Sequence, residues 1–223
     1  MSGRPGEADD RKSEAWRTAV SGLAGVDLHA AAQKGDFDHR GGPGKSVAVI
    51  PCFGRSIRVE LPEGRVSAHP DIDLFSLKVL AMRYAARADG FPVTGEWVAY
   101  RELPGGLFYA ATIPAAVEQP LAEAFGWERG SLSEAASRLG GAAAGFGDES
   151  FVFRAYPRVP LLAVLHWGDE EFPPAARVLF DRCCSHYLNT DDLKVLATQL
   201  AALLLRLSGR DYRAEDNLLW MVD

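Results

Sequence analysis

An acidic turn between two apolar runs holds the densest set of side chains that could do chemistry. Asp169 and Glu170 lie between the apolar run 161–165 and a double proline. Carboxylate oxygens are the ligands that magnesium and calcium prefer, so this turn could hold a hard cation together with Asp148 and Asp181. The alternating acidic spacing of a calcium-binding loop is missing, however. Paired acids are also common in solvated turns that bind nothing.

The apolar run ends in His166 and Trp167, where a buried strand would reach the edge of its sheet. Ligand clefts often open at such edges, and histidine titrates close to working pH. With Asp169 nearby, His166 could act as a general base or as an axial ligand. The alternative is a histidine at a strand end that only satisfies backbone groups.

Cys183, Cys184 and His186 form a second cluster of reactive side chains. Thiolates with an imidazole suit zinc, and a cysteine–histidine pair could supply a nucleophile. Neighbouring residues on a helix point about 100° apart, so the two cysteines cannot easily bind one tetrahedral ion. Free cysteine is also among the most buried residue types, and we therefore favour packing in the core.

Three features could bind an anion. The segment 41–46, GGPGKS, lacks the first glycine of a phosphate loop because His39 occupies that position, and it leads into a strand instead of a helix. The segment 140–147 is glycine-rich but lacks a lysine and a following helix start, so we expect a mobile connection. Bidentate contacts to a carboxylate or phosphate could come from Arg154, Arg158 and Arg177. Pairing with the acidic turn is the use that we expect for these arginines.

Alternating hydrophobic residues and tight turns predict strands in both halves of the chain. We expect strands over residues 46–52, 55–61, 151–153, 160–166 and 177–180, and a short one at Val66. Short connections favour antiparallel pairing. The segment 160–166 is apolar throughout, which indicates a central strand covered on both faces.

Helical spacing predicts the remaining elements. We expect two short helices within residues 13–33, longer helices over 71–88, 114–125, 131–139 and 190–207, and a helical region over 182–188. Ser131 and Glu134 have the spacing of a capping box, and Thr190 is expected to cap the last helix. The predicted fold is α+β: a single domain over residues 13–223 with a mainly antiparallel sheet, helices packed on one face and a long C-terminal helix. Residues 1–12 are expected to be disordered.

The composition is that of a soluble globular protein. The 223 residues are 48% hydrophobic and 24% charged, which allows an ordinary core without metal or disulfides. The net charge of −6 argues against nucleic acid as the main partner. Three cysteines, two of them adjacent, fit a reducing cytoplasm. No apolar run reaches the roughly 20 residues of a membrane span, and no signal-peptide core is present, so we expect a cytoplasmic protein.

Several short motifs together resemble one protein family. They are RELPGG at 101–106, GG at 140–141, GD at 147–148, PRVP at 157–160, GDEEFP at 168–173, LFD at 179–181 and YL at 187–188. The pattern is similar to the uncharacterised family catalogued as domain of unknown function 3786, over roughly residues 14–207. The resemblance implies occurrence mainly in anaerobic bacteria and archaea, and it brings no established activity. Some members carry a separate cysteine-rich iron–sulfur segment, whereas the cysteines here lack C-x₂-C spacing.

Two classes of function follow from these observations. The first is a non-catalytic ligand-binding or accessory protein, which the resemblance associates with anaerobic redox or one-carbon metabolism. Its site would lie at the end of the 161–167 strand, with the candidate residues Asp148, Arg158, His166, Trp167, Asp169, Glu170 and Asp181. The second is an enzyme in which His166, Asp169 and Glu170 act with a divalent metal. Spacing alone assembles no complete catalytic constellation, and no G-x-S-x-G motif is present, which favours the first class.

The sequence leaves the binding partner open. A small-molecule ligand and a protein partner are both compatible with the candidate residues, while nucleic acid and membrane are not expected. No cofactor is indicated, and the oligomeric state is unknown.

Overall fold

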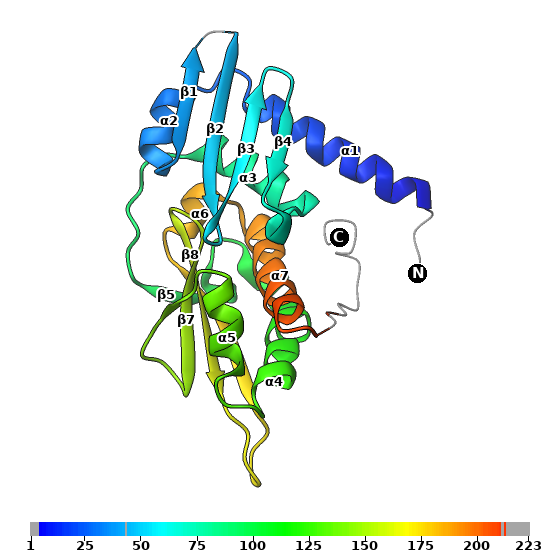
Figure 1. The fold of residues 1–223 in the computed structure, drawn as a ribbon, viewed down its shortest axis with the longest axis vertical. Helices are drawn as coiled ribbons and strands as arrows, with labels where there is room; N and C mark the ends of the chain where they lie inside the picture. The colour runs from blue at the N-terminus through cyan, green and yellow to red at the C-terminus, as the bar shows by residue number, and fades with distance from the viewer. Residues whose placement is uncertain (1–4, 43, 211, 213–223) are drawn as a thin grey trace.

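The computed structural model describes residues 5–42, 44–210 and 212 of the chain. It contains two antiparallel sheets and helices that pack against them, which confirms the predicted α+β class (Figure 1). The strands divide between a four-stranded sheet in the first third of the chain and a five-stranded sheet in the remainder. No helix in the described part of the chain has the length and apolar character that crossing a bilayer requires.

The four-stranded sheet is an antiparallel meander. Its strands are β1 (Asp38–Gly42), β2 (Lys45–Cys52), β3 (Arg55–Leu61) and β4 (Arg65–Ala68), in that order across the sheet. Strand β1 corrects the sequence-based expectation of a glycine-rich loop over residues 35–45. Its sequence, DHRGG, has no alternating apolar residues, and only its pairing with β2 makes it a strand. Gly41 has a φ of 113°, and a Cβ there would lie 2.3 Å from the Lys45 carbonyl oxygen.

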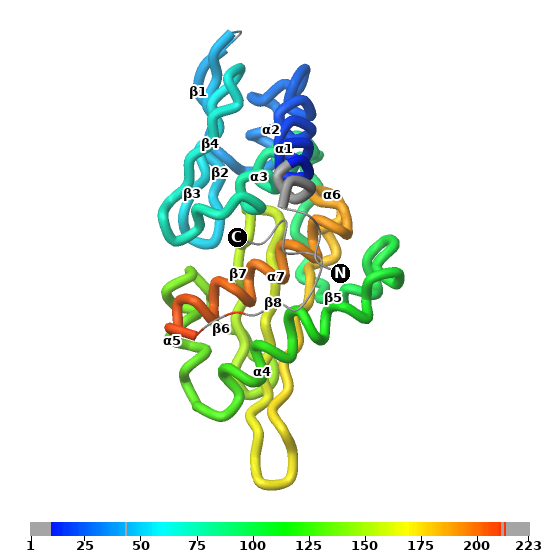
Figure 2. The backbone as a smooth tube through the Cα atoms, turned by 90° about the vertical axis from the view of Figure 1, so that its right-hand side faces the viewer, coloured from blue at the N-terminus to red at the C-terminus, as the bar shows by residue number. Residues whose placement is uncertain are grey.

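Three helices cover one side of this sheet (Figure 2). They are α1 (Pro5–Gly22), α2 (Leu28–Gly35) and α3 (Phe75–Arg87), and a 3₁₀ turn at Pro70–Ile72 precedes α3. Helix α1 begins at Pro5, within residues 1–12, whose disorder stays a prediction. Buried residues alternate along β2 and β3, which leaves the other face of the sheet partly solvated.

The five-stranded sheet carries the candidate site. Its strands are β5 (Trp97–Ala99), β6 (Ala142–Ala143), β7 (Glu149–Tyr156), β8 (Val159–His166) and β9 (Ala175–Asp181). The order across the sheet is β5-β9-β8-β7-β6, all antiparallel, so β8 is the central strand. Every residue of β8 is buried except His166, which confirms the prediction of a central strand covered on both faces.

The helices of the second half pack on this sheet and on one another. They are α4 (Gln119–Phe125), which continues a π-helical turn at Pro114–Glu118, α5 (Ser131–Arg138), α6 (Cys184–Tyr187) and α7 (Thr190–Leu207). Two 3₁₀ turns, Tyr100–Glu102 and Gly106–Phe108, follow β5. The long C-terminal helix was predicted, but its N-cap was not. The Asn189 side chain accepts from the Asp192 N–H (2.8 Å), while the Thr190 hydroxyl donates to the Pro104 carbonyl (2.6 Å).

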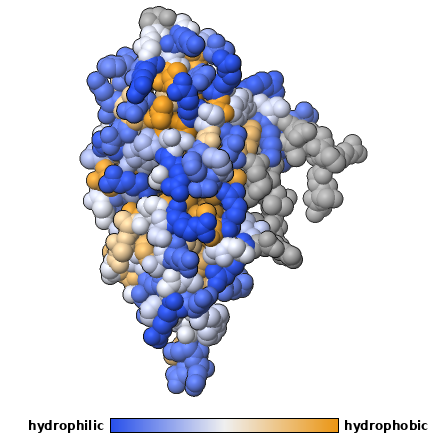
Figure 3. All heavy atoms as spheres, viewed as in Figure 1, coloured by the Kyte–Doolittle hydropathy of each residue, from blue (hydrophilic) through white to orange (hydrophobic). Residues whose placement is uncertain are grey.

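One contiguous hydrophobic core connects both sheets. Tyr84 of α3 stacks on Tyr156 of β7, with ring centroids 5.1 Å apart, and on Tyr187 of α6 at 5.4 Å. The Tyr156 hydroxyl donates to the Leu77 carbonyl (2.8 Å). Hydrophilic residues cover most of the face seen in Figure 3, where hydrophobic residues show only in separate patches. The assignment of residues 13–223 to a single domain stays a prediction.

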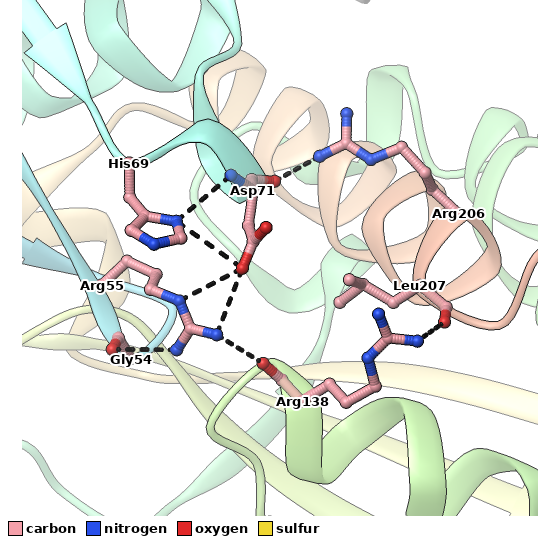
Figure 4. A network of polar contacts seen from close by, with 7 residues as sticks. All are labelled: Gly54, Arg55, His69, Asp71, Arg138, Arg206 and Leu207. Atoms are coloured by element: carbon pink, nitrogen blue, oxygen red, sulfur yellow. Dashed lines mark hydrogen bonds and ion pairs between the residues drawn. The ribbon is translucent and has the colours of Figure 1, made fainter.

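A polar network also ties the four-stranded sheet to helices α5 and α7 (Figure 4). Arg55 donates from Nε and Nη2 to Asp71 Oδ2 (3.3 and 3.2 Å) and from Nη2 to the Arg138 carbonyl (3.2 Å). Arg206 of α7 donates to the Asp71 carbonyl, and Arg138 donates to the Leu207 carbonyl. Arginine suits this position because its planar guanidinium serves several acceptors at once.

Candidate functional site

Three loops meet where β8 ends, and we call this region the loop end of the five-stranded sheet. They are 126–130 between α4 and α5, 144–148 between β6 and β7, and 167–174 between β8 and β9. The Gly168 N–H donates to the Gly126 carbonyl (3.0 Å), and the Trp167 N–H donates to Asp148 Oδ2 (3.0 Å). These bonds join the third loop to the first and to the second, so the loops form one connected surface.

Asp148 and His166 lie side by side at the loop end. The Asp148 Oδ2 atom, besides accepting from the Trp167 N–H, is 3.7 Å from His166 Nδ1. The His166 side chain is 56% exposed and that of Asp148 is 42% exposed. The structure therefore brings three of the predicted site residues together, with both ionisable side chains accessible to a partner.

Trp167 is fixed by two polar neighbours. Its Nε1–H donates to Glu149 Oε1 (3.0 Å), and the Arg129 guanidinium lies 4.6 Å from the centroid of its ring. The Glu149 carboxylate also accepts from two backbone N–H groups at the N-terminus of α5 (2.8 and 3.1 Å). The capping box expected from Ser131 and Glu134 is therefore wrong, because a carboxylate from β7 caps this helix instead.

The acidic turn that contains Asp169 and Glu170 is stabilised by hydrogen bonds within the turn. Asp169 Oδ1 accepts from the N–H groups of Glu171 and Phe172, at 2.8 Å each. The loop extends beyond the rest of the molecule at its lower end, which both views show (Figures 1 and 2). Asp169 thus acts as a turn residue, as the alternative to a metal ligand predicted. Within the described residues, no three His, Cys, Asp or Glu side chains come together to hold a metal ion.

Asp181 lies at the opposite end of the β8–β9 pair from His166. Its carboxylate is fully buried and accepts from the Thr94 N–H (3.1 Å), the Thr94 hydroxyl (2.7 Å), the Gly95 N–H (2.6 Å) and the Cys183 N–H (2.9 Å). Burial raises the pKa of Asp181, but the hydrogen bonds from Cys183 and Thr94 outweigh it and hold the pKa below its ordinary value. Asp181 anchors the segment before β5 and does not join the loop end.

Arg158 also lies away from the loop end, in the turn between β7 and β8. Its backbone N–H donates to the Tyr84 hydroxyl (3.2 Å), and its carbonyl accepts from Cys183 Sγ (3.3 Å). The predicted pairing of these arginines with the acidic turn is wrong for Arg177, which pairs with Glu118 at 2.7 Å. The seven predicted site residues therefore belong to two separate ends of the sheet.

The three cysteines pack in the core, as the sequence favoured. Cys52, Cys183 and Cys184 are free and fully buried. Cys184 Sγ donates to the Pro160 carbonyl at 3.4 Å. Burial raises the pKa of the Cys52 and Cys184 thiols, which keeps both in the unreactive protonated form.

Exposed aromatic residues are the feature of the loop end that the sequence analysis missed. Trp127, Phe146 and Phe172 come from the three different loops and are 63%, 48% and 66% exposed. The Trp127 ring lies so close to Gly168 that a Cβ there would be 2.7 Å from it, so this glycine allows the close approach. The sequence repeats the motif G-D-E-x-F at residues 147–151 and 168–172. Phe151 of the first copy is buried in β7, whereas Phe172 of the second copy is exposed.

The fold and this end of the sheet define an α+β protein with an acidic, aromatic loop surface. Residues 27–202 match the model of a family described as domain of unknown function (DUF3786), and the chain belongs to that family. The resemblance drawn from the sequence motifs is thereby confirmed, and the anaerobic habitat that it implies stays a prediction. Comparison with curated proteins and with solved structures gave no match.

Proposed function

We propose that this protein is a non-catalytic accessory protein that docks onto a basic protein surface through its loop end. The observation that carries the proposal is the set of three exposed aromatic rings, Trp127, Phe146 and Phe172, on loops that hydrogen bonds hold together. Aromatic side chains have few rotatable bonds, so they lose little entropy on binding, and they are the usual anchors of protein interfaces. Large exposed apolar side chains gathered in one region are also typical of interaction sites.

The charges of the loop end indicate the chemistry of the partner. The acidic residues of the three loops are Glu128, Asp148, Asp169, Glu170 and Glu171, and their one basic residue is Arg129. An acidic surface with aromatic anchors complements a partner that presents lysine or arginine around an apolar pocket. A second copy of the chain would bring the same negative charge to the interface, which disfavours self-association through this end.

The resemblance to the family suggests a partner from anaerobic redox or one-carbon metabolism, and this part of the proposal rests on association alone. A cytoplasmic location and the absence of nucleic-acid and membrane partners stay predictions. The alternative of a metal-dependent enzyme would need His166, Asp169 and Glu170 around one ion. The ion-pair partner of His166 is Asp148, and Asp169 is engaged in its own turn, so the geometry offers this alternative no support.

The proposal can be tested by replacing Phe172 with the photo-crosslinking residue p-benzoylphenylalanine in cells. Phe108 is the matched control, because it is 86% exposed but lies outside the loop end. We expect the Phe172 variant to cross-link to a protein with a basic surface and the Phe108 variant not to do so. In a titration with the purified partner, Trp127→Ala should weaken binding by about 2 kcal/mol, roughly thirtyfold.

The control substitution Phe108→Ala should leave the affinity for that partner unchanged. Cross-links only to a second copy of the chain would overturn the proposal. Equal affinities for the wild type and Trp127→Ala would do the same.

A further inference from the structure

A cavity of about 670 Å³ opens well away from the loop end and is independent of the proposed docking surface. It lies between the C-terminal end of α3, the turn at Gly106–Phe108, helix α6 and the first turn of α7. This volume is in the range of sites that hold small organic molecules. Its walls carry groups whose arrangement restricts what could bind there.

His186 is held in one orientation on the wall of the cavity. Its Nδ1 atom is 2.7 Å from Asp89 Oδ2, and its ring stacks on Phe91 with centroids 3.7 Å apart and an interplanar angle of 11°. Burial raises the pKa of Asp89, but the hydrogen bonds from the Phe91 N–H and from His186 outweigh it, so the pKa lies below its ordinary value. The Asp89 carboxylate engages Nδ1 of His186, and no residue of the described chain is a partner of its Nε2.

Two opposite charges line the same cavity without pairing. Arg87 is in the last turn of α3 and Asp191 is in the first turn of α7. Neither side chain makes a hydrogen bond or a close ion pair with any residue that the structure describes, although the charge of Arg87 acts on the buried Asp192 and opposes the rise of its pKa. Both charges suit the dipoles of their helices, which explains their presence at these helix ends. Because both side chains also face the cavity, both are available to a ligand.

The cavity also has an apolar wall. Phe108 and Tyr109 line it, and they are 86% and 46% exposed. The Lys194 ammonium lies 4.5 Å from the centroid of the Tyr109 ring, a contact that helps to hold the ring in place. A ligand with an apolar side group would cover surface that now faces water.

The balance of charges excludes the simplest ligands. A small anion would meet Arg87 but would also face the carboxylates of Asp89 and Asp191. A small cation would meet these two carboxylates but would also be repelled by Arg87. A molecule that carries both charges satisfies both walls, because each of its charged groups finds an opposite partner.

We propose that this cavity binds an α-amino acid with an apolar side chain. Its carboxylate pairs with the Arg87 guanidinium. Its ammonium group donates to the Asp191 carboxylate. Its side chain lies against Phe108 and Tyr109.

The test is isothermal titration of the purified protein with leucine, methionine and phenylalanine. The matched analogues are 3-phenylpropanoate, which lacks the ammonium group, and 2-phenylethylamine, which lacks the carboxylate. We expect saturable binding of at least one of the three amino acids, and affinities for the two analogues that are weaker by on the order of tenfold or more. Binding of neither amino acid nor analogue at millimolar concentrations would overturn the proposal, and so would equal binding of an amino acid and an analogue.

Two substitutions assign the ligand to the cavity. Arg87→Met and Asp191→Asn change exposed side chains, so both variants should fold, and each should weaken amino-acid binding by about tenfold or more. Arg65→Met and Asp38→Asn are the controls, because they make the same changes on exposed strands of the four-stranded sheet and should leave binding unchanged. Binding to the two cavity variants as tight as to the wild type would place the ligand elsewhere and refute the assignment.

Discussion

The two ends of the β8–β9 pair use aspartate in opposite ways. At one end Asp181 is fully buried and accepts four hydrogen bonds from the surrounding chain. At the other end Asp148 is 42% exposed and accepts one backbone hydrogen bond, with His166 beside it. A carboxylate whose acceptor positions are all used can hold a fold together but has nothing left for a ligand. A half-exposed carboxylate costs little to keep ionised and can still meet a partner.

The largest effect on stability should come from replacing Asp181, and the same replacement of Asp148 is the comparison. Asp181→Ala removes the buried acceptor of three backbone N–H groups and a hydroxyl, of which the Cys183 N–H is itself buried, and we expect it to lower the free energy of unfolding by about 3 kcal/mol. Asp148→Ala should lower it by about 1 kcal/mol or less, because water can replace the lost acceptor. Urea-induced unfolding at neutral pH measures both changes. Similar losses in the two variants would show that the ends of the sheet do not differ as the structure indicates.

The stabilisation of the fold by Asp181 should depend on pH. Because the pKa of Asp181 is lower in the folded protein than in the unfolded chain, its ionised form stabilises the fold above the ordinary aspartate pKa of about 3.9. That contribution is lost as the pH falls through the folded-state pKa. Asp181→Asn has no group to titrate, so its deficit against the wild type, about 3 kcal/mol at neutral pH, should shrink as the pH falls below about 4. A deficit that stays constant down to about pH 3 would contradict a lowered pKa for Asp181.

Glu149 joins the loop end to helix α5, and its loss should have an intermediate effect. Glu149→Ala removes the acceptor of the Trp167 indole N–H and of two N–H groups at the start of α5. We expect a loss of about 1–2 kcal/mol in the free energy of unfolding and a changed tryptophan fluorescence spectrum. Glu128→Ala is the control, because that side chain is 71% exposed and, among the described residues, pairs only with Arg210. Equal stability of the two variants would show that Glu149 does not stabilise the junction between the loop end and α5.

Regular patterns in the sequence predicted much of this fold. The apolar segment 160–166 identified the central strand, and the leucine spacing after Thr190 identified α7, because burial on both faces and helical amphipathicity leave direct traces in composition. Strand β1 left no such trace, since its residues are exposed and only the partner strand orders them. Local rules therefore worked where the cause of the structure was local or hydrophobic.

The candidate site was harder to predict because it depends on contacts distant in sequence. Asp181 and Asp169 are near one another in the sequence, but the intervening strand β9 carries them to different ends of the sheet. The cap of α5 comes from Glu149, which lies on strand β7 and follows the helix in the sequence. No local capping motif could therefore have indicated it. The exposure of Trp127 and Phe172 could not be predicted from the sequence either, since an aromatic residue is usually expected to lie in the core.

The smallest effect on stability is expected at the tip of the loop that extends from the sheet. Phe172→Ser changes a side chain that is 66% exposed, and it should alter the free energy of unfolding by about 0.5 kcal/mol or less. Thermal unfolding should therefore hardly distinguish it from the wild type, while cross-linking and affinity for the proposed partner should fall. This separation is what a docking side chain requires, because its contacts form only in the complex. A stability loss as large as that of Glu149→Ala would instead make Phe172 part of the fold and leave the loop end without its most exposed phenylalanine as an anchor.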